Sequence, residues 1–205
     1  MNIRDFIKNH FDFKLNCSAV IAIICLLLIT PCSLYLPQTY GYENGLIENI
    51  QMVILIITFI LCLKAKDNKK FFIFTALIIT ILILREINCG RTLFFAIPGK
   101  ENEFYKWSEI KYGYLAHPLF GLYMLSVAIY FIKNKLYIPL WNYITKYAIP
   151  VYNTLFLITG MLLGIYADKH TNNLVLEETS ELLMYVSLAG IIFYYGFIKH
   201  NSTEK

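Results

Sequence analysis

Ionisable and amide side chains lie at the ends of several apolar stretches of this sequence, where they could support acid–base chemistry. Glu48 and Gln51 are three positions apart, so they share one face of a helix. Arg85 and Glu86 end another apolar stretch, and His117 lies near the start of a third. A carboxylate or an imidazole can transfer a proton, and a guanidinium can hold a phosphate or carboxylate group of a substrate.

A second acidic group lies around the start of the last apolar stretch. The spacing of Glu177, Glu178 and Glu181 places Glu181 beside either of the other two on a helix. One imidazole and several carboxylates can hold Zn²⁺, Mn²⁺ or iron, and the metal then lowers the pKa of a bound water toward about 7. The candidate ligands of such a divalent metal cofactor are His117, Glu178 and Glu181.

These residue types predict catalytic and substrate-binding roles within one site. A glutamate that binds no metal would act as the general base, and an arginine would hold an anionic group. The sequence has no H-E-x-x-H motif and no E-x-x-H repeat, so a metal-free acid–base site on the same residues is an alternative. The candidate catalytic residues are His117, Glu48, Glu86 and Glu178, and the candidate substrate-binding residues are Arg85, Arg91 and Gln51.

The composition of the chain is typical of an integral membrane protein. Of its 205 residues, 58% are hydrophobic and 16% are charged, against roughly 45–50% and about 25% in average soluble proteins. Six spans of about 20 residues each would use most of the chain, which disfavours a nucleotide-binding module or a nucleic-acid partner. The five cysteines form no C-x-x-C pair, so they indicate neither a zinc ribbon nor a disulfide framework.

We therefore predict an all-α polytopic protein with a single transmembrane domain. The side that holds both termini carries 12 of the 18 Lys and Arg residues, so we expect both termini in the cytoplasm and a bacterial inner membrane as the location. The candidate residues then lie at the outer ends of helices two, three, four and six. The expected helices lie at about 17–36, 47–63, 71–87, 114–132, 147–166 and 181–198.

The candidate residues are expected at the same depth in the membrane, which predicts that they share a pocket beneath the outer surface. A charge that faces lipid costs roughly 1–3 kcal/mol even near the interface, so groups at this depth should face one another. The connection 88–113 would cover the pocket. After the Pro98-Gly99 turn, the spacing of Phe104, Trp107, Ile110 and Tyr114 predicts an amphipathic interfacial helix, which would either anchor the chain or gate lateral access for a lipid-like substrate.

Each candidate also has a purely structural interpretation. Acidic residues such as Glu177 are favoured in a first helical turn by the helix dipole. Arg85 can extend to the interface and pair with Glu86, and a lone histidine is commonly a hydrogen-bonded packing residue. The Gly160-x-x-x-Gly164 spacing favours close packing of helices inside this chain over a dimer interface.

Two segments resemble motifs of a group of bacterial polytopic membrane proteins. The segments are ENGLIENIQ (43–51) and REINCGRTLF (85–94), and the group carries an E-D-G-L-x-E segment, then E-E-I-S-W-G-Q-R-I-F at a helix end, then a histidine. Glu48, Glu86 and Gly90 match this pattern and His117 occupies a suitable place for the third element, whereas Arg85 replaces the first glutamate of the second motif. The resemblance implies a site at Glu48, Glu86 and His117, in a group without an assigned activity.

The sequence leaves three function classes open. The favoured class is a membrane-embedded hydrolase or transferase that acts on a lipid-like or anionic substrate and uses a divalent metal or acid–base groups alone. The second class is a substrate-binding or transport subunit, although transport normally places polar groups near the midplane, where these helices are apolar. The third class is an accessory or immunity-type protein whose charged rim binds another protein; beyond the lipid bilayer, the sequence identifies no partner.

Overall fold

The computed structural model describes residues 10–198, and this part of the chain is almost entirely helical. Among these residues, five helices are long and apolar enough to cross a membrane, or six if Lys69–Glu86 and Asn88–Phe94, bent by 56°, form one span. The predicted all-α polytopic fold is confirmed, and the chain is an integral membrane protein. The long helices are α2 (Cys17–Tyr35), α3 (Leu46–Lys64), α4 (Lys69–Glu86), α6 (Ala116–Lys133), α8 (Val151–His170) and α9 (Leu174–Phe193).

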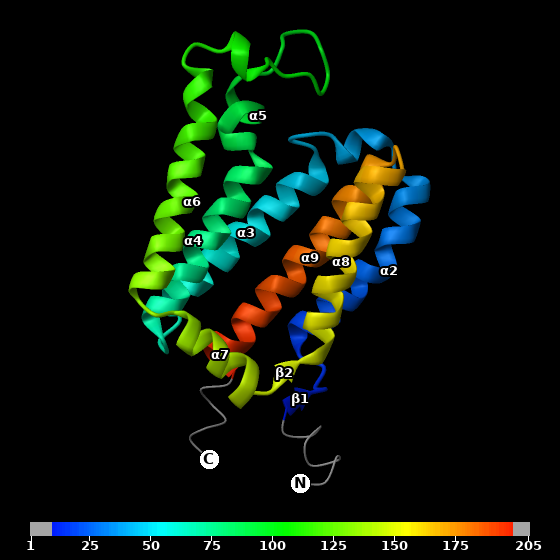
Figure 1. The fold of residues 1–205 in the computed structure, drawn as a ribbon. Helices are drawn as coiled ribbons and strands as arrows, with labels where there is room; N and C mark the ends of the chain where they lie inside the picture. Colours follow the sequence, from blue (N-terminus) through cyan, green and yellow to red (C-terminus); the bar gives the residue numbers. More distant parts are fainter. Residues whose placement is uncertain (1–9, 199–205) are drawn as a thin grey trace.

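Short elements connect the long helices and define the two ends of the bundle. Figure 1 places β1, β2 and α7 at one end, the strand end, and α5 at the opposite end, the α5 end. The two strands pair in parallel, with Phe11 opposite Ile149. The short elements are β1 (Phe11–Asp12), η1 (Gln38–Gly41), η2 (Asn88–Gly90), α5 (Arg91–Phe94), η3 (Trp107–Glu109), η4 (Gly113–Leu115), α7 (Tyr137–Lys146), β2 (Ile149–Pro150) and the π-helical η5 (Tyr194–Ile198).

Helix α9 is the centre of the bundle. Helix α8 packs along it most extensively, and α2 and α3 also contact it, whereas α4 packs on α3 and α6 lies on α4 (Figure 1). Helix α6 is largely exposed, as expected for a helix that borders lipid. The apolar core among α3, α4 and α9 includes Leu55, Phe72, Ile79, Tyr185 and Ile192.

Small residues allow α8 and α9 to pack closely. A Cβ atom at Gly160 would lie 2.7 Å from the backbone nitrogen of Met184 and 2.7 Å from the backbone oxygen of Ser180. At Gly164 it would lie 3.4 Å from Cγ of Glu181. The Gly160-x-x-x-Gly164 motif therefore packs α8 against α9 within the chain and fixes the segment that carries Glu181.

Helix α9 begins before the expected start at 181. The side chain of Asn173 accepts a hydrogen bond from the backbone nitrogen of Leu176 (2.9 Å) and caps the helix. The acidic residues that follow lower the local hydropathy, so an apolar window locates the helix too late in the sequence. Glu177 and Glu178 consequently lie within the helix, and Glu181 lies more than a turn inside it.

The expected amphipathic helix in 88–113 is wrong. Gly99, at φ 81°, reverses the chain, and two backbone hydrogen bonds, Ile97 N to Glu103 O (3.0 Å) and Tyr105 N to Phe95 O (2.9 Å), join its arms in a small hairpin. These bonds hold the backbone at Phe104 in an extended conformation. Phe104 therefore lies in the hairpin and Trp107 in the turn η3, and the two do not share a helix face.

The connection between α6 and α8, where we expected no element, contains the surface helix α7. This helix packs Tyr143 against Phe71 (ring centroids 5.0 Å apart).

Candidate functional site

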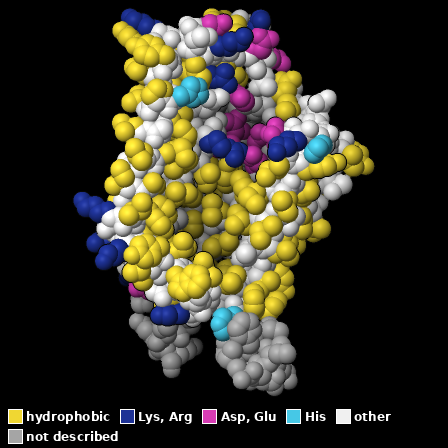
Figure 2. All heavy atoms as spheres, in the orientation of Figure 1, with side chains coloured by type: hydrophobic (Ala, Val, Ile, Leu, Met, Phe, Trp, Pro, Cys, Tyr) yellow, Lys and Arg dark blue, Asp and Glu magenta, His cyan; other side chains and the backbone are white. Residues whose placement is uncertain are grey.

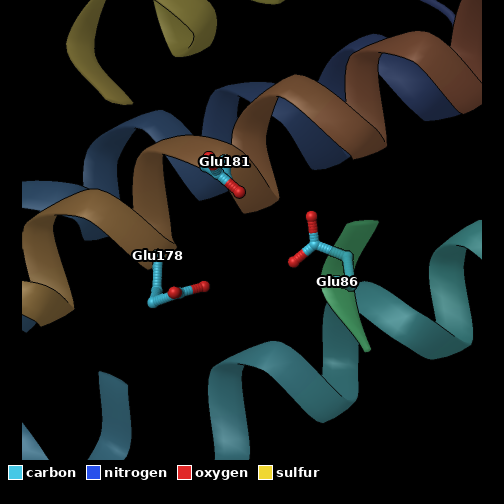
Figure 3. Close-up of side chains that lie close together, drawn as sticks. All are labelled: Glu86, Glu178 and Glu181. Atoms are coloured by element: carbon cyan, nitrogen blue, oxygen red, sulfur yellow. The ribbon is translucent and has the colours of Figure 1, made fainter. Parts of the chain in front are cut away.

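Three glutamates from two helices meet at the α5 end of the bundle. Glu178 and Glu181 extend from α9, and Glu86 is the last residue of α4. One carboxylate oxygen of each lies within 4.8 Å of the others (Figure 3). We call Glu86, Glu178 and Glu181 the acidic cluster. Helix α4 ends here because Asn88, Cys89 and Gly90 all have positive φ, so the chain leaves helical geometry and bends before α5.

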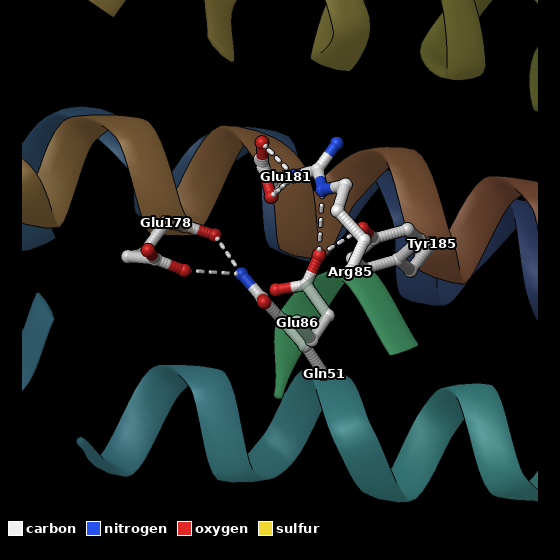
Figure 4. A network of polar contacts seen from close by, with 6 residues as sticks. All are labelled: Gln51, Arg85, Glu86, Glu178, Glu181 and Tyr185. Carbon is white, nitrogen blue, oxygen red and sulfur yellow. Dashed lines mark hydrogen bonds and ion pairs between the residues drawn. The ribbon is translucent and has the colours of Figure 1, made fainter. Parts of the chain in front are cut away.

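Arg85 joins two members of the acidic cluster. Its Nε lies 3.1 Å from Oε1 of Glu86, and its Nη2 donates to both carboxylate oxygens of Glu181 (Figure 4). The Arg85 side chain is 51% exposed, whereas the side chains of Glu86 and Glu181 are 6% and 17% exposed. The guanidinium therefore lies at the mouth of the cluster, and its outer face is available to an anion.

Tyr185 and Gln51 hold the buried side of the cluster. The Tyr185 hydroxyl donates to Oε1 of Glu86 (2.5 Å), and Nε2 of Gln51 donates to Oε2 (2.8 Å) and to the backbone oxygen (2.7 Å) of Glu178 (Figure 4). Both side chains are completely buried. Oε1 of Gln51 has no hydrogen-bond partner among the described residues.

Sequence reasoning missed Tyr185, although a signal for it was present. Glu178, Glu181 and Tyr185 follow one another at spacings of three and four, which places them on one face of α9. A tyrosine on the same face as two buried carboxylates is a natural hydrogen-bond donor to them.

Glu48 lies beside the acidic cluster without joining it. Its side chain is buried and accepts a hydrogen bond from the backbone nitrogen of Asn44. It lines a pocket of about 200 Å³ together with Ile87 and Leu93 from the end of α4 and from α5. Glu48 is close enough to Glu86 and Glu181 for its charge to repel theirs.

His117 and Arg91 lie outside the acidic cluster. His117 is exposed on α6, and its ring packs edge-on against Trp107 (ring centroids 6.0 Å apart). Arg91 lies 4.0 Å from the Glu43 carboxylate and over the ring of Phe104. Of the predicted site residues, the structure brings together Gln51, Arg85, Glu86, Glu178 and Glu181 and places Glu48 next to them. Within residues 10–198, His117 does not belong to the group of possible metal ligands. Helix α6 lies on α4 and away from α9, so equal depth does not bring its first turn to the cluster.

The site carries more carboxyl groups than Arg85 alone can neutralise. Figure 2 shows the acidic side chains gathered in a hollow near the α5 end, with Lys and Arg side chains at its rim. Carboxylates this close repel one another strongly where water is scarce, and an unpaired buried charge costs several kcal/mol. The arrangement therefore favours the uptake of protons or of a cation, and Arg85 offers a place for an anion.

Comparison with protein-family models, with curated protein sequences and with solved structures gives no match to this chain.

Proposed function

We propose that this integral membrane protein is a hydrolase or transferase that acts on a lipid-like or anionic substrate. The observation that carries the proposal is the position of Arg85. Its guanidinium pairs with the carboxylates of Glu86 and Glu181, while half of its side chain is exposed at the mouth of the hollow. The Lys and Arg distribution supports an orientation with this end at the outer leaflet of a bacterial inner membrane.

The contacts divide the roles among the glutamates. Glu86 and Glu181 hold Arg85, so they position the guanidinium for an anionic substrate group. Glu178 does not pair with Arg85, and its Oε1 has no hydrogen-bond partner among the described residues. Glu178 is therefore the general base: it takes a proton from water or from an acceptor hydroxyl, and the oxygen of that group forms a bond to the phosphorus or acyl carbon that Arg85 holds in place. The bond from that atom to the oxygen of the leaving group breaks, and Glu178 returns the proton to the leaving oxygen.

An apolar groove favours a substrate with a hydrocarbon chain. The groove has a volume of about 460 Å³ and is lined in part by Leu84 of α4. Its walls come from α4, α6 and the connection between them, so it runs beside helices that border lipid. The groove has room for an acyl or prenyl chain of a lipid-like substrate. The other residues that line the groove are Cys89, Trp107, Tyr112, Leu115, Ala116, Leu119, Phe120 and Tyr123.

The proposal is tested with the full chain in lipid nanodiscs. Anionic glycerophospholipids and prenyl phosphates are supplied, and released phosphate, fatty acid and headgroup are measured by mass spectrometry. We expect turnover that Glu178→Gln reduces at least 100-fold, within the range for loss of a general base, and that Arg85→Gln also reduces. Glu177→Gln is the matched control, because it changes an adjacent acid that lies outside the acidic cluster.

Two other results would replace the proposal. Saturable lipid binding without turnover, lost in Arg85→Gln, would make the protein a substrate-binding or transport subunit. Neither binding nor turnover by the folded chain would leave the accessory or immunity-type role.

A further inference from the structure

We infer that the acidic cluster is a binding site for one hard divalent cation of the size of Ca²⁺ or Mn²⁺, with Gln51 as an additional oxygen ligand. The inference rests on the proposed function and revises one role in it. With the cation bound, Glu178 is a ligand, and the cation lowers the pKa of the attacking water that Glu178 deprotonates in the metal-free site. The inference also changes the ligand set expected from the sequence, since Gln51 and Glu86 replace His117.

The unpartnered oxygen of Gln51 is the observation that points to a ligand. Gln51 is completely buried, yet its Oε1 accepts no hydrogen bond among residues 10–198. The amide orientation is fixed, because Nε2 donates to two oxygens of Glu178. Oε1 belongs to the same planar group, so it also lies at the acidic cluster (Figure 4). A buried acceptor beside carboxylates is satisfied only by a proton donor or a cation.

The hydrogen bonds leave one oxygen of each of two glutamates available as well. Arg85 and Tyr185 both bond Oε1 of Glu86, and Gln51 bonds Oε2 of Glu178. The described contacts therefore leave Oε2 of Glu86 and Oε1 of Glu178 free to bind a metal. Glu181 becomes a ligand when Arg85, which is half exposed, moves toward solvent.

The donor type and spacing select the kind of metal. All four donors are carboxylate or amide oxygens, which suit Ca²⁺, Mg²⁺ and Mn²⁺ more than zinc or copper. Calcium–oxygen distances of roughly 2.3–2.6 Å place opposite ligands about 5 Å apart, whereas magnesium requires about 4.2 Å. The carboxylate oxygens lie within 4.8 Å of one another, so one ion can contact all three once Arg85 has moved away from Glu181. Mg²⁺ demands near-ideal octahedral geometry and keeps several waters, so a site of protein oxygens suits it less well than Ca²⁺.

The experiment measures metal binding without any substrate. The full chain in nanodiscs is titrated with Mn²⁺ and followed by electron paramagnetic resonance, and Ca²⁺ and Mg²⁺ are added as competitors. We expect one Mn²⁺ per chain, displaced more effectively by Ca²⁺ than by Mg²⁺. Glu178→Gln should weaken binding at least tenfold, and Glu177→Gln should leave it unchanged.

Two further variants keep the test independent of one substitution. Gln51→Leu removes the amide oxygen at similar volume and should weaken Mn²⁺ binding severalfold. Arg85→Gln removes a competing positive charge and should strengthen Mn²⁺ binding, whereas a purely structural ion pair predicts no gain. Size-exclusion profiles identify variants that do not fold, and those that fold decide the outcome.

The inference is overturned if the folded wild-type chain binds no Mn²⁺ saturably, or if Glu178→Gln and Glu177→Gln bind it equally. An infrared band of a protonated carboxyl group that Mn²⁺ does not remove would also overturn it, because a proton would then satisfy the acceptors. Saturable Mn²⁺ binding without lipid turnover would contradict the proposed enzymatic function and support the metal site. Lipid turnover that persists in the presence of a chelator would support the enzymatic function and contradict the metal site.

Discussion

Loss of a single hydroxyl group tests whether Tyr185 organises the acidic cluster. The Tyr185 hydroxyl donates to Oε1 of Glu86 from a fully buried position, and Tyr185→Phe removes this bond with almost no change in shape. A hydrogen bond to a charged group contributes about 1.5–3 kcal/mol, whereas hydrogen bonds between membrane helices average about 0.6 kcal/mol. Arg85 still contacts the same oxygen at 3.1 Å, so Glu86 keeps a partner. We therefore expect a loss of about 1–2 kcal/mol in the free energy of unfolding.

The measurement is reversible unfolding in mixed micelles with a denaturing detergent. Tyr123→Phe is the matched control, because it removes a hydroxyl that donates to the backbone oxygen of Leu77 at 3.2 Å, also between two helices. That bond is longer, partly buried and uncharged, so its loss should cost no more than about 0.6 kcal/mol. Combining Tyr185→Phe with Glu86→Gln should give a coupling energy of about 1 kcal/mol. Equal losses for the two tyrosine variants, with no coupling to Glu86, would refute the reasoning.

Three further predictions test the packing, the histidine and the orientation. Gly160→Leu should destabilise the chain by about 3 kcal/mol or more, because even a Cβ lies 2.7 Å from the α9 backbone, whereas Gly121→Ala, with nothing within 4 Å, should be neutral or slightly stabilising in the same unfolding assay. His117→Ala should leave Mn²⁺ binding and turnover unchanged, since His117 is exposed and packs on Trp107; a tenfold loss of either would place the histidine in the site. A cysteine introduced in 98–103 should react with a membrane-impermeant thiol reagent in intact cells and one in 66–70 should not; reversed labelling would invert the proposed orientation.

Composition and apolar length were sufficient to predict the membrane helices. Each expected stretch overlaps one of the long helices, because a span requires an apolar run of about 20 residues whatever its neighbours are. The start of α9 was misplaced because its first turns are acidic, and the cap at Asn173 marks that start better than hydropathy does.

For the candidate site, the sequence could predict only the depth of its residues in the membrane. Residues such as Glu86 and Glu181 lie at the same end of the bundle as His117, but depth does not say which way a side chain faces around its helix axis. The packing of α4 between α6 and the rest of the bundle separates His117 from the acidic cluster, and this arrangement depends on contacts far apart in the sequence. The pairing of Arg85 with Glu181 and of Gln51 with Glu178 has the same origin.

The central position of α9 also constrains how the protein is made. Helices enter the membrane in chain order, and α9 is the last of the long helices in the described part of the chain to leave the ribosome, although α2, α3 and α8 all pack on it. Until it inserts, Arg85 and Glu86 lack their partners Glu181 and Tyr185. Newly inserted chains therefore carry a polar group at the end of α4 in which Arg85 and Glu86 have only each other as partners. A nascent chain that stalls before α9 presents this polar surface to membrane chaperones and quality-control proteases.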